Sequence, residues 1–365
     1  MNAQLNHPWS VFVSNGEVFI ADTYNHRVRK LLRNGEIVTI AGDGNEIGEC
    51  IDGQLAPDSQ LYFPMSVFVS SSNQVYISEV GSNGIRKIDQ YGMISALARP
   101  GKEGYSGDGQ LAIHAQLRSP RGLFVTEEDE VYFCDWGNHR VRKIDRFGVI
   151  STIAGNGEEG YNGDDILATD ASLNYPSLVY VYKNEVYIVD SNNHRIRKID
   201  QHGMIKTIAG TGEGGYNGDD QPATSAKINN PFGLVFHNDQ IYFSDEYNHR
   251  VRMIFSNGII KTIAGNGSCG NDGDGKLAIE SQLNSPTGLF VDDSGIYICC
   301  DESLIRKVDS NGILTTIVGT GEEGYSGDVE FDFEQYPHIG PRKKPLIKPF
   351  PHAYNDLIVS VSEFV

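Results

Sequence analysis

The sequence contains no apolar run long enough to cross a membrane. A spanning helix needs roughly 18 or more consecutive apolar residues, and polar or charged residues interrupt every apolar run before that length. The first nine residues also lack the basic and then apolar pattern of a secretory signal peptide. We therefore expect a soluble, unprocessed chain that has no membrane partner.

Cysteine is scarce and irregularly placed. The chain has five cysteines, an odd number, and Cys299 and Cys300 are adjacent. A disulfide framework and a CxxC metal site both require regular spacings that are missing. A reducing compartment follows, and we expect a cytoplasmic location.

Positively charged residues are also few. The chain has 30 Lys and Arg but 48 Asp and Glu, so its net charge is −18. Proteins that bind nucleic acid need basic surface to displace counterions from phosphates. The composition therefore argues against a nucleic-acid partner. RNA binding through a local basic patch stays open as a minor alternative.

Repetition dominates what the sequence does contain. The stretch Asp135–Asp145, which includes Asn-His-Arg-Val-Arg, has close copies at 22–31, 190–200 and 245–254. Two weaker copies, at 84–89 and 304–309, lack Asn-His-Arg, and Glu79 and Asp301 stand where the leading Asp is expected. Six copies of one unit indicate a repeat architecture.

A proline opens each unit and sets the period. A chain of 365 residues exceeds the roughly 250–300 residues that one undivided core supports. A period of 55 or 56 residues carried by short strands is typical of a propeller or solenoid. The prolines are Pro8, Pro64, Pro120, Pro176, Pro231 and Pro286.

The third repeat shows four strand-like runs, at 122–125, 131–134, 140–144 and 149–154, joined by short hairpin connectors. The second run is apolar on both faces, as in a buried strand, and the fourth run carries polar residues such as Thr152, as in an edge strand. We predict an all-β, six-bladed β-propeller of four-stranded antiparallel blades over residues 1–328, with the first strand innermost.

With its proline, two apolar strands, terminal Asp and Asn-His-Arg turn, the chain resembles the NHL repeat family over about Pro8–Asp328. Four units carry the full pattern, whereas 79–85 and 301–305 depart from it. The resemblance implies a six-bladed propeller that serves mostly as a binding platform for proteins or RNA.

The repeated Asp and His are interpreted as structural. The Asp ends a strand and accepts hydrogen bonds from the turn, Asn takes an unusual backbone angle, and Arg pairs with that Asp or with one in the next blade. The alternative makes the histidines ligands or bases, but a site needs one constellation rather than a symmetric set. The positions are Asp22, His26, Asp135, His139, Asp190, His194, Asp245 and His249.

Long connectors after the fourth strands share a Gly-Tyr-x-Gly-Asp pattern and contain GxGxxG. A dinucleotide site needs a helix after that motif, and acidic residues follow here instead. We expect the Asp to cap a helical turn; calcium binding is an alternative, although EF-hand spacing is absent. No cofactor or metal is predicted. The capping residues are Asp108, Asp164, Asp219 and Asp274.

The second and fourth connectors of every blade emerge on the same face, so the elaborated loops share one rim. Residues that differ between blades at these turns are candidates for partner binding: Tyr24, Arg99, Trp136, Glu246 and Tyr247. We predict a monomeric, non-catalytic binding or scaffold propeller that recognises a protein or peptide through this acidic face. A hydrolase or lyase site at the central channel is the alternative.

Residues 329–365 break the repeat. They contain a basic, proline-rich segment at 340–349, expected to be extended, and a strand-like run at 357–361. Either this run closes the propeller, or it leads into a further domain.

Overall fold

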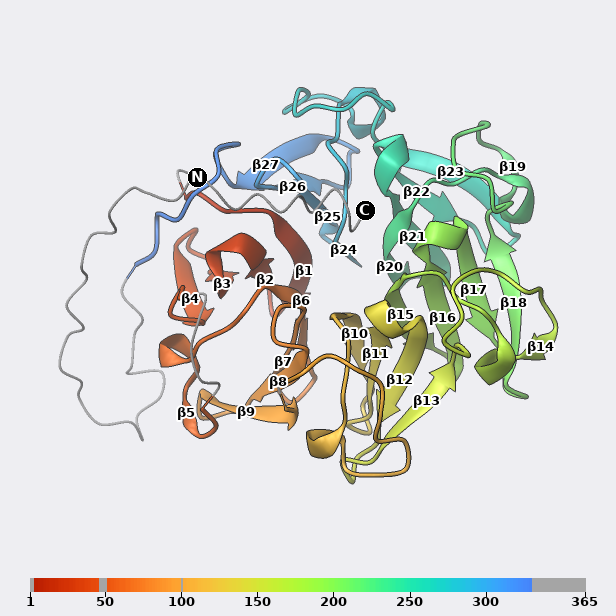
Figure 1. The fold of residues 1–365 in the computed structure, drawn as a ribbon. Helices are drawn as coiled ribbons and strands as arrows, with labels where there is room; N and C mark the ends of the chain where they lie inside the picture. Colours follow the sequence, from red (N-terminus) through yellow and green to blue (C-terminus); the bar gives the residue numbers. More distant parts are fainter. Residues whose placement is uncertain (1–2, 46–50, 100, 330–365) are drawn as a thin grey trace, which may run out of the picture. The chain divides into compact units, whose positions relative to one another are not determined.

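The computed structural model describes residues 3–45, 51–99 and 101–329. Within these residues, six antiparallel sheets are arranged around a central axis, so the predicted six-bladed β-propeller is confirmed (Figure 1). In each sheet the first strand of the repeat lies at one edge and the fourth follows the third, as predicted. The closing strand and the extended segment predicted in the tail lie outside the described residues.

The strand bounds follow the repeats. Blade one contains β1 (Pro8–Ser14), β2 (Glu17–Asp22), β3 (Arg27–Leu31) and β4 (Ile37–Ala41). Blade two contains β6 (Pro64–Val69), β7 (Val75–Glu79), β8 (Gly84–Ile88) and β9 (Met93–Ala98). Blade three contains β10 (Pro120–Val125), β11 (Val131–Asp135), β12 (Arg140–Ile144) and β13 (Ile150–Ala154). Blade four contains β15 (Pro176–Tyr182), β16 (Glu185–Asp190), β17 (Arg195–Ile199) and β18 (Met204–Ala209). Blade five contains β20 (Pro231–His237), β21 (Gln240–Asp245), β22 (Arg250–Ile254) and β23 (Ile259–Ala264). Blade six contains β24 (Leu289–Asp292), β25 (Gly295–Cys300), β26 (Leu304–Val308) and β27 (Leu314–Val318).

Three sheets gain a short fifth strand from the connector that precedes the blade. These strands are β5 (Gln54–Leu55), β14 (Ile166–Leu167) and β19 (Gln221–Pro222), and each pairs antiparallel with the outermost strand of its sheet. The prediction of four strands a blade is therefore one strand short in blades two, four and five. The extra strands cover part of an otherwise open sheet edge.

Short 3-10 turns occupy two kinds of connector. At the Asn-His-Arg turns they are η1 (Thr23–Asn25), η4 (Trp136–Asn138), η6 (Ser191–Asn193) and η8 (Glu246–Asn248). In the long connectors they are η2 (Ala56–Asp58), η3 (Ala112–His114), η5 (Ala168–Asp170), η7 (Ala223–Ser225) and η9 (Ala278–Glu280).

The predicted capping role of the connector aspartates is wrong. The residue before each helical turn of the long connectors is a leucine or proline, for example Leu111 before η3, and no side chain caps the turn. Asp108, Asp164, Asp219 and Asp274 instead accept hydrogen bonds from arginines of the following blade.

The hydrophobic core lies between neighbouring blades. Ile85 of blade two packs in one cluster with Phe133 and Ile150 of blade three. Blade six meets blade one directly in the same way, because Cys299 and Ile305 share a cluster with Ile20. Neighbouring repeats therefore bury their apolar faces against one another, as expected for a repeat protein.

Candidate functional site

The Asn-His-Arg turns join one blade to the next through histidine. His139 takes the left-handed backbone conformation, with φ of 52°, so the prediction that Asn carries the unusual angle is wrong. Its Nδ1 accepts a hydrogen bond from the backbone N–H of Tyr175, 3.3 Å away in the following connector. Burial lowers the pKa of His139, which favours the neutral ring that this bond requires. The same bond recurs from Phe63 to His26, from Asn230 to His194 and from Ser285 to His249.

The two blades that lack Asn-His-Arg keep this bond with other side chains. Asn83 and Ser303 have φ of 56° and 58° and occupy the histidine position. The Oδ1 of Asn83 accepts from the N–H of Ser119 at 2.8 Å, and the Oγ of Ser303 accepts from the N–H of His7 at 3.2 Å. The turn therefore needs a hydrogen-bond acceptor, which histidine, asparagine and serine all supply.

A second interblade network links the Gly-Tyr-x-Gly-Asp connectors to the third strands. Arg142 is fully buried, and its two terminal nitrogens donate to Asp135 at 3.1 Å and to Asp108 at 2.8 Å. The ring of Tyr105 lies over its guanidinium, with the guanidinium carbon 4.8 Å from the ring centre. The predicted ion pairing thus involves the second arginine of the motif. The first, Arg140, donates to backbone carbonyls and ties the turn to the next long connector, on the shared rim.

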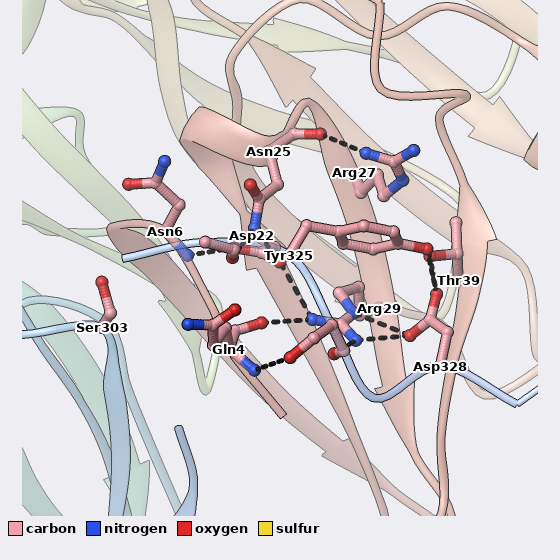
Figure 2. A network of polar contacts seen from close by, with 12 residues as sticks. Gln4, Asn6, Asp22, Asn25, Arg27, Arg29, Thr39, Ser303, Tyr325 and Asp328 are labelled. Carbon is pink, nitrogen blue, oxygen red and sulfur yellow. Dashed lines mark hydrogen bonds and ion pairs between the residues drawn. The ribbon is translucent and has the colours of Figure 1, made fainter. Parts of the chain in front are cut away.

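The same network closes the ring between blades six and one (Figure 2). Arg29 donates to Asp328 at 3.0 Å through Nε, and lies 3.4 Å from Asp22. Tyr325 stacks over Arg29 and donates its hydroxyl to Asp328. The connector after β27 therefore binds blade one through the aspartate–arginine hydrogen bond that also joins the connectors before blades three to six to those blades.

The first strands surround an apolar cavity of about 280 Å³ on the propeller axis. Phe12 contacts Phe68 on one side and Phe290 on the other, with ring centres 4.6 and 4.9 Å apart. The series continues through Phe124 to Tyr180. Val235 takes the corresponding place in blade five, since it pairs with Tyr242 as Phe124 pairs with Tyr132.

Beside these aromatic rings, the residues that follow the prolines of blades one, three and five lie close to one another. They are Trp9, Arg121 and Phe232. Trp9 and Phe232 pack with ring centres 5.1 Å apart. The guanidinium carbon of Arg121 lies 5.8 Å from the Trp9 ring and 5.9 Å from the Phe232 ring. Blades one, three and five thus each contribute one large side chain to this end of the central cavity, which we call the channel mouth.

Arg121 also stacks on Trp136, with its guanidinium carbon 3.9 Å from the ring centre. Its Nε is buried without a hydrogen-bond partner. Burial lowers the pKa of Arg121 to about 10, although the neighbouring Glu246 opposes this shift. The mouth therefore holds a cation in largely aromatic surroundings.

Glu246 is the acidic neighbour of Arg121. It is buried and accepts a hydrogen bond from Asn230 at 2.8 Å. Burial raises the pKa of Glu246 to about 8, against the opposing charge of Arg121. Its carboxyl group is therefore mainly protonated at neutral pH.

The structure gathers four of the five candidate binding residues around Arg121. Trp136 stacks on it, and Glu246, Tyr24 and Tyr247 all interact with its charge. The fifth, Arg99, lies apart and pairs with Asp52 at 3.2 Å. Sequence analysis missed Arg121, Trp9 and Phe232. The available signal was that Arg121 is the only charged residue among the six that follow the blade prolines.

The described part of the chain has no group of three or more His, Cys, Asp or Glu side chains placed to hold a metal ion. In the same residues, no helix is both long and apolar enough to span a bilayer.

Two protein-family models match parts of the chain. A family model described as the teneurin NHL domain matches residues 96–161 and 266–329, and one described as the NHL repeat matches residues 5–31. Protein SUPPRESSOR OF QUENCHING 1, chloroplastic, of Arabidopsis thaliana is 29% identical over 81% of this chain and 29% of its own length. NHL repeat-containing protein 2 of Gallus gallus is 26% identical over 78% of this chain and 43% of its own length. The chain thus spans less than half the length of these relatives.

A solved protein of unknown function from Bacteroides thetaiotaomicron has a similar fold. It superposes with a TM-score of 0.62 at 15% identity, over 84% of this chain and 70% of its own. At that identity the likeness concerns the fold alone.

Proposed function

Since the chain belongs to the NHL repeat family, we propose that its propeller is a non-catalytic platform that binds a protein or peptide at the channel mouth. The observation that carries the proposal is the convergence of Trp136, Tyr24 and Tyr247 on Arg121. Aromatic residues and arginine are the residue types most enriched at the centres of protein interfaces.

The exposure of these residues also supports the proposal. Tyr247 is 39% exposed, and Tyr24 is half-buried against His7 and Phe63. A rigid aromatic side chain that is partly buried before binding loses little conformational entropy when a partner covers it. The surrounding repeat scaffold positions these groups independently of any partner.

The test is affinity capture with the full chain from its native extract, comparing Trp136→Ala and Tyr247→Ala with Phe147→Ala. Phe147 is 70% exposed and lies in the turn between β12 and β13, on the opposite face. We expect specific proteins to be lost with the first two variants and retained with the third. The proposal fails if Phe147→Ala removes the captured proteins while the two mouth variants keep them.

Catalysis by a hydrolase or lyase at the central channel, and RNA binding through a basic patch, stay alternative predictions. If RNA is recovered with the wild-type chain, affinity that falls steeply with salt would favour the second alternative.

A cytoplasmic location is part of the same proposal. Cys134, Cys269, Cys299 and Cys300 are all unpaired in the described residues, which suits a reducing compartment. Microscopy of the tagged full chain tests this, and secretion or uptake into an organelle would contradict it.

A further inference from the structure

We propose that Arg121 binds a carboxylate that is attached to an apolar group, such as the C-terminal residue of a peptide with a large apolar side chain. This inference rests on the proposed function and specifies the chemistry of the partner. It follows from the unused donors of Arg121, the aromatic surfaces beside it and the apolar cavity below it.

The hydrogen-bonding state of Arg121 differs from that of three third-strand arginines. Arg142, Arg197 and Arg252 each donate to two aspartates. Arg121, in contrast, donates no hydrogen bond to any residue that the structure describes. Its Nε is buried without a partner, as are the Nε atoms of those three arginines. A guanidinium offers five N–H donors in a planar fork that fits a carboxylate through two parallel bonds. Leaving these donors unused in a partly desolvated place is costly unless a ligand takes them up.

The side chains around Arg121 select the rest of the ligand. Trp136 covers one face of the guanidinium, and Trp9 and Phe232 lie just beyond it. Trp9 and Phe232 also line the apolar cavity of about 280 Å³. A ligand whose charge meets Arg121 can therefore place an adjoining apolar group against these rings or toward the cavity.

The local charge favours a singly charged group. The charge of Asp301 acts on Glu246 and Tyr247, the neighbours of Arg121, and the whole chain has a net charge of −18. These charges repel a doubly charged phosphate more strongly than a carboxylate. The single charge of a guanidinium is matched by one carboxylate.

Tryptophan fluorescence provides a direct test, because the chain has two tryptophans and both lie near the guanidinium of Arg121. The full chain is titrated with N-acetylphenylalanine, with its neutral amide, and with N-acetylaspartic acid α-amide, which carries only a side-chain carboxylate. We expect the first probe to bind about tenfold or more tightly than its amide, since only the acid forms charge-assisted bonds. It should also bind more tightly than the aspartyl probe, which lacks the apolar group.

Arg121→Gln should remove the preference for the acid, and Arg121→Lys should weaken it, since lysine keeps the charge but loses the planar fork. Arg99→Gln is the matched control and should change nothing, and the unfolding midpoint of each variant checks its folding. Equal binding of acid and amide to the wild type, a preference that survives in both Arg121 variants, or no response to any probe at millimolar concentration overturns the inference. If Arg121→Gln still captures the partners that Trp136→Ala loses, the carboxylate inference fails while the proposed function stands.

Discussion

Asp328 and Arg29, separated by 299 residues, form an ion pair in which two guanidinium nitrogens donate to one carboxylate oxygen. Arg29 is fully buried, and the side chain of Asp328 is 15% exposed. This pair joins the last described connector to the first blade (Figure 2). Closure of the ring therefore uses the same contact that links internal blades, as in the pair of Asp108 with Arg142.

Replacing Asp328 should consequently weaken the whole propeller. We expect Asp328→Ala to lower the free energy of unfolding by about 2 kcal/mol or more. The buried guanidinium of Arg29 would lose a charged acceptor and keep Asp22 and the backbone carbonyls of Gln4 and Ser326. Denaturant unfolding measures the change. The exposed Glu322 in the same connector provides a control, since Glu322→Gln should stay within about 0.5 kcal/mol of the wild type. Equal stability of Asp328→Ala and the wild type would show that closure does not depend on this pair.

The histidine position should tolerate asparagine better than alanine. Asn83 already makes in blade two the bond that His139 makes in blade three. His139→Asn should therefore keep an acceptor for the N–H of Tyr175 and cost less than about 1 kcal/mol. His139→Ala removes the acceptor and lacks the polar side chain with which asparagine tolerates positive φ, so a loss of about 2 kcal/mol is expected. Thermal or denaturant unfolding of both variants decides, and the same cost for both would contradict this account.

Stability should depend on pH through Glu246. Its folded-state pKa, raised to about 8 by burial, exceeds the ordinary value, so the folded state holds a proton that the unfolded state releases at lower pH. The resulting stabilisation is fully present below the ordinary pKa of glutamate and is lost as pH rises through about 8. In Glu246→Gln the side-chain amide does not titrate, so the variant lacks this pH-dependent stabilisation. The wild type should thus lose stability relative to the variant as pH rises from 5 to 9, in unfolding experiments across roughly that range. A constant difference would mean that Glu246 has an ordinary pKa.

Close contact between the inner strands should make Gly122 hard to replace. A β-carbon at Gly122 would lie 2.6 Å from the carbonyl oxygen of Ser177 in the next blade. Gly122→Ala should therefore destabilise the fold by about 1–3 kcal/mol through overpacking. Gly101→Ala serves as the control, because a β-carbon there meets only one atom, at 3.9 Å. Unfolding midpoints test this, and a neutral Gly122→Ala would indicate that the blades can separate at the axis.

Much of the fold could be predicted because the relevant signals are local. The proline period, the apolar second strand and the polar fourth strand are properties of short segments, and they repeat six times. The short fifth strands, such as β14, could not be predicted. Two residues that pair with a neighbouring blade carry no periodic signal of their own.

The candidate site was only partly predictable. Comparison of the turns identified Trp136, Tyr24 and Tyr247 as the residues that differ between blades, but not that they lie together. Arg99 also differed and lies elsewhere, in a pair with Asp52. Variation along a repeat shows where symmetry is broken, but not which of the broken positions face one another.

The repeating unit, the order of its strands and the side that carries the long connectors all follow from hydrophobic pattern and spacing along the chain. The partner that each side chain meets depends on how the six blades assemble. Closing the ring brings Arg29 to Asp328 and places Trp9, Arg121 and Phe232 around one axis. Their spacing in sequence is a property of the repeat, whereas their contact exists only once six blades share a centre.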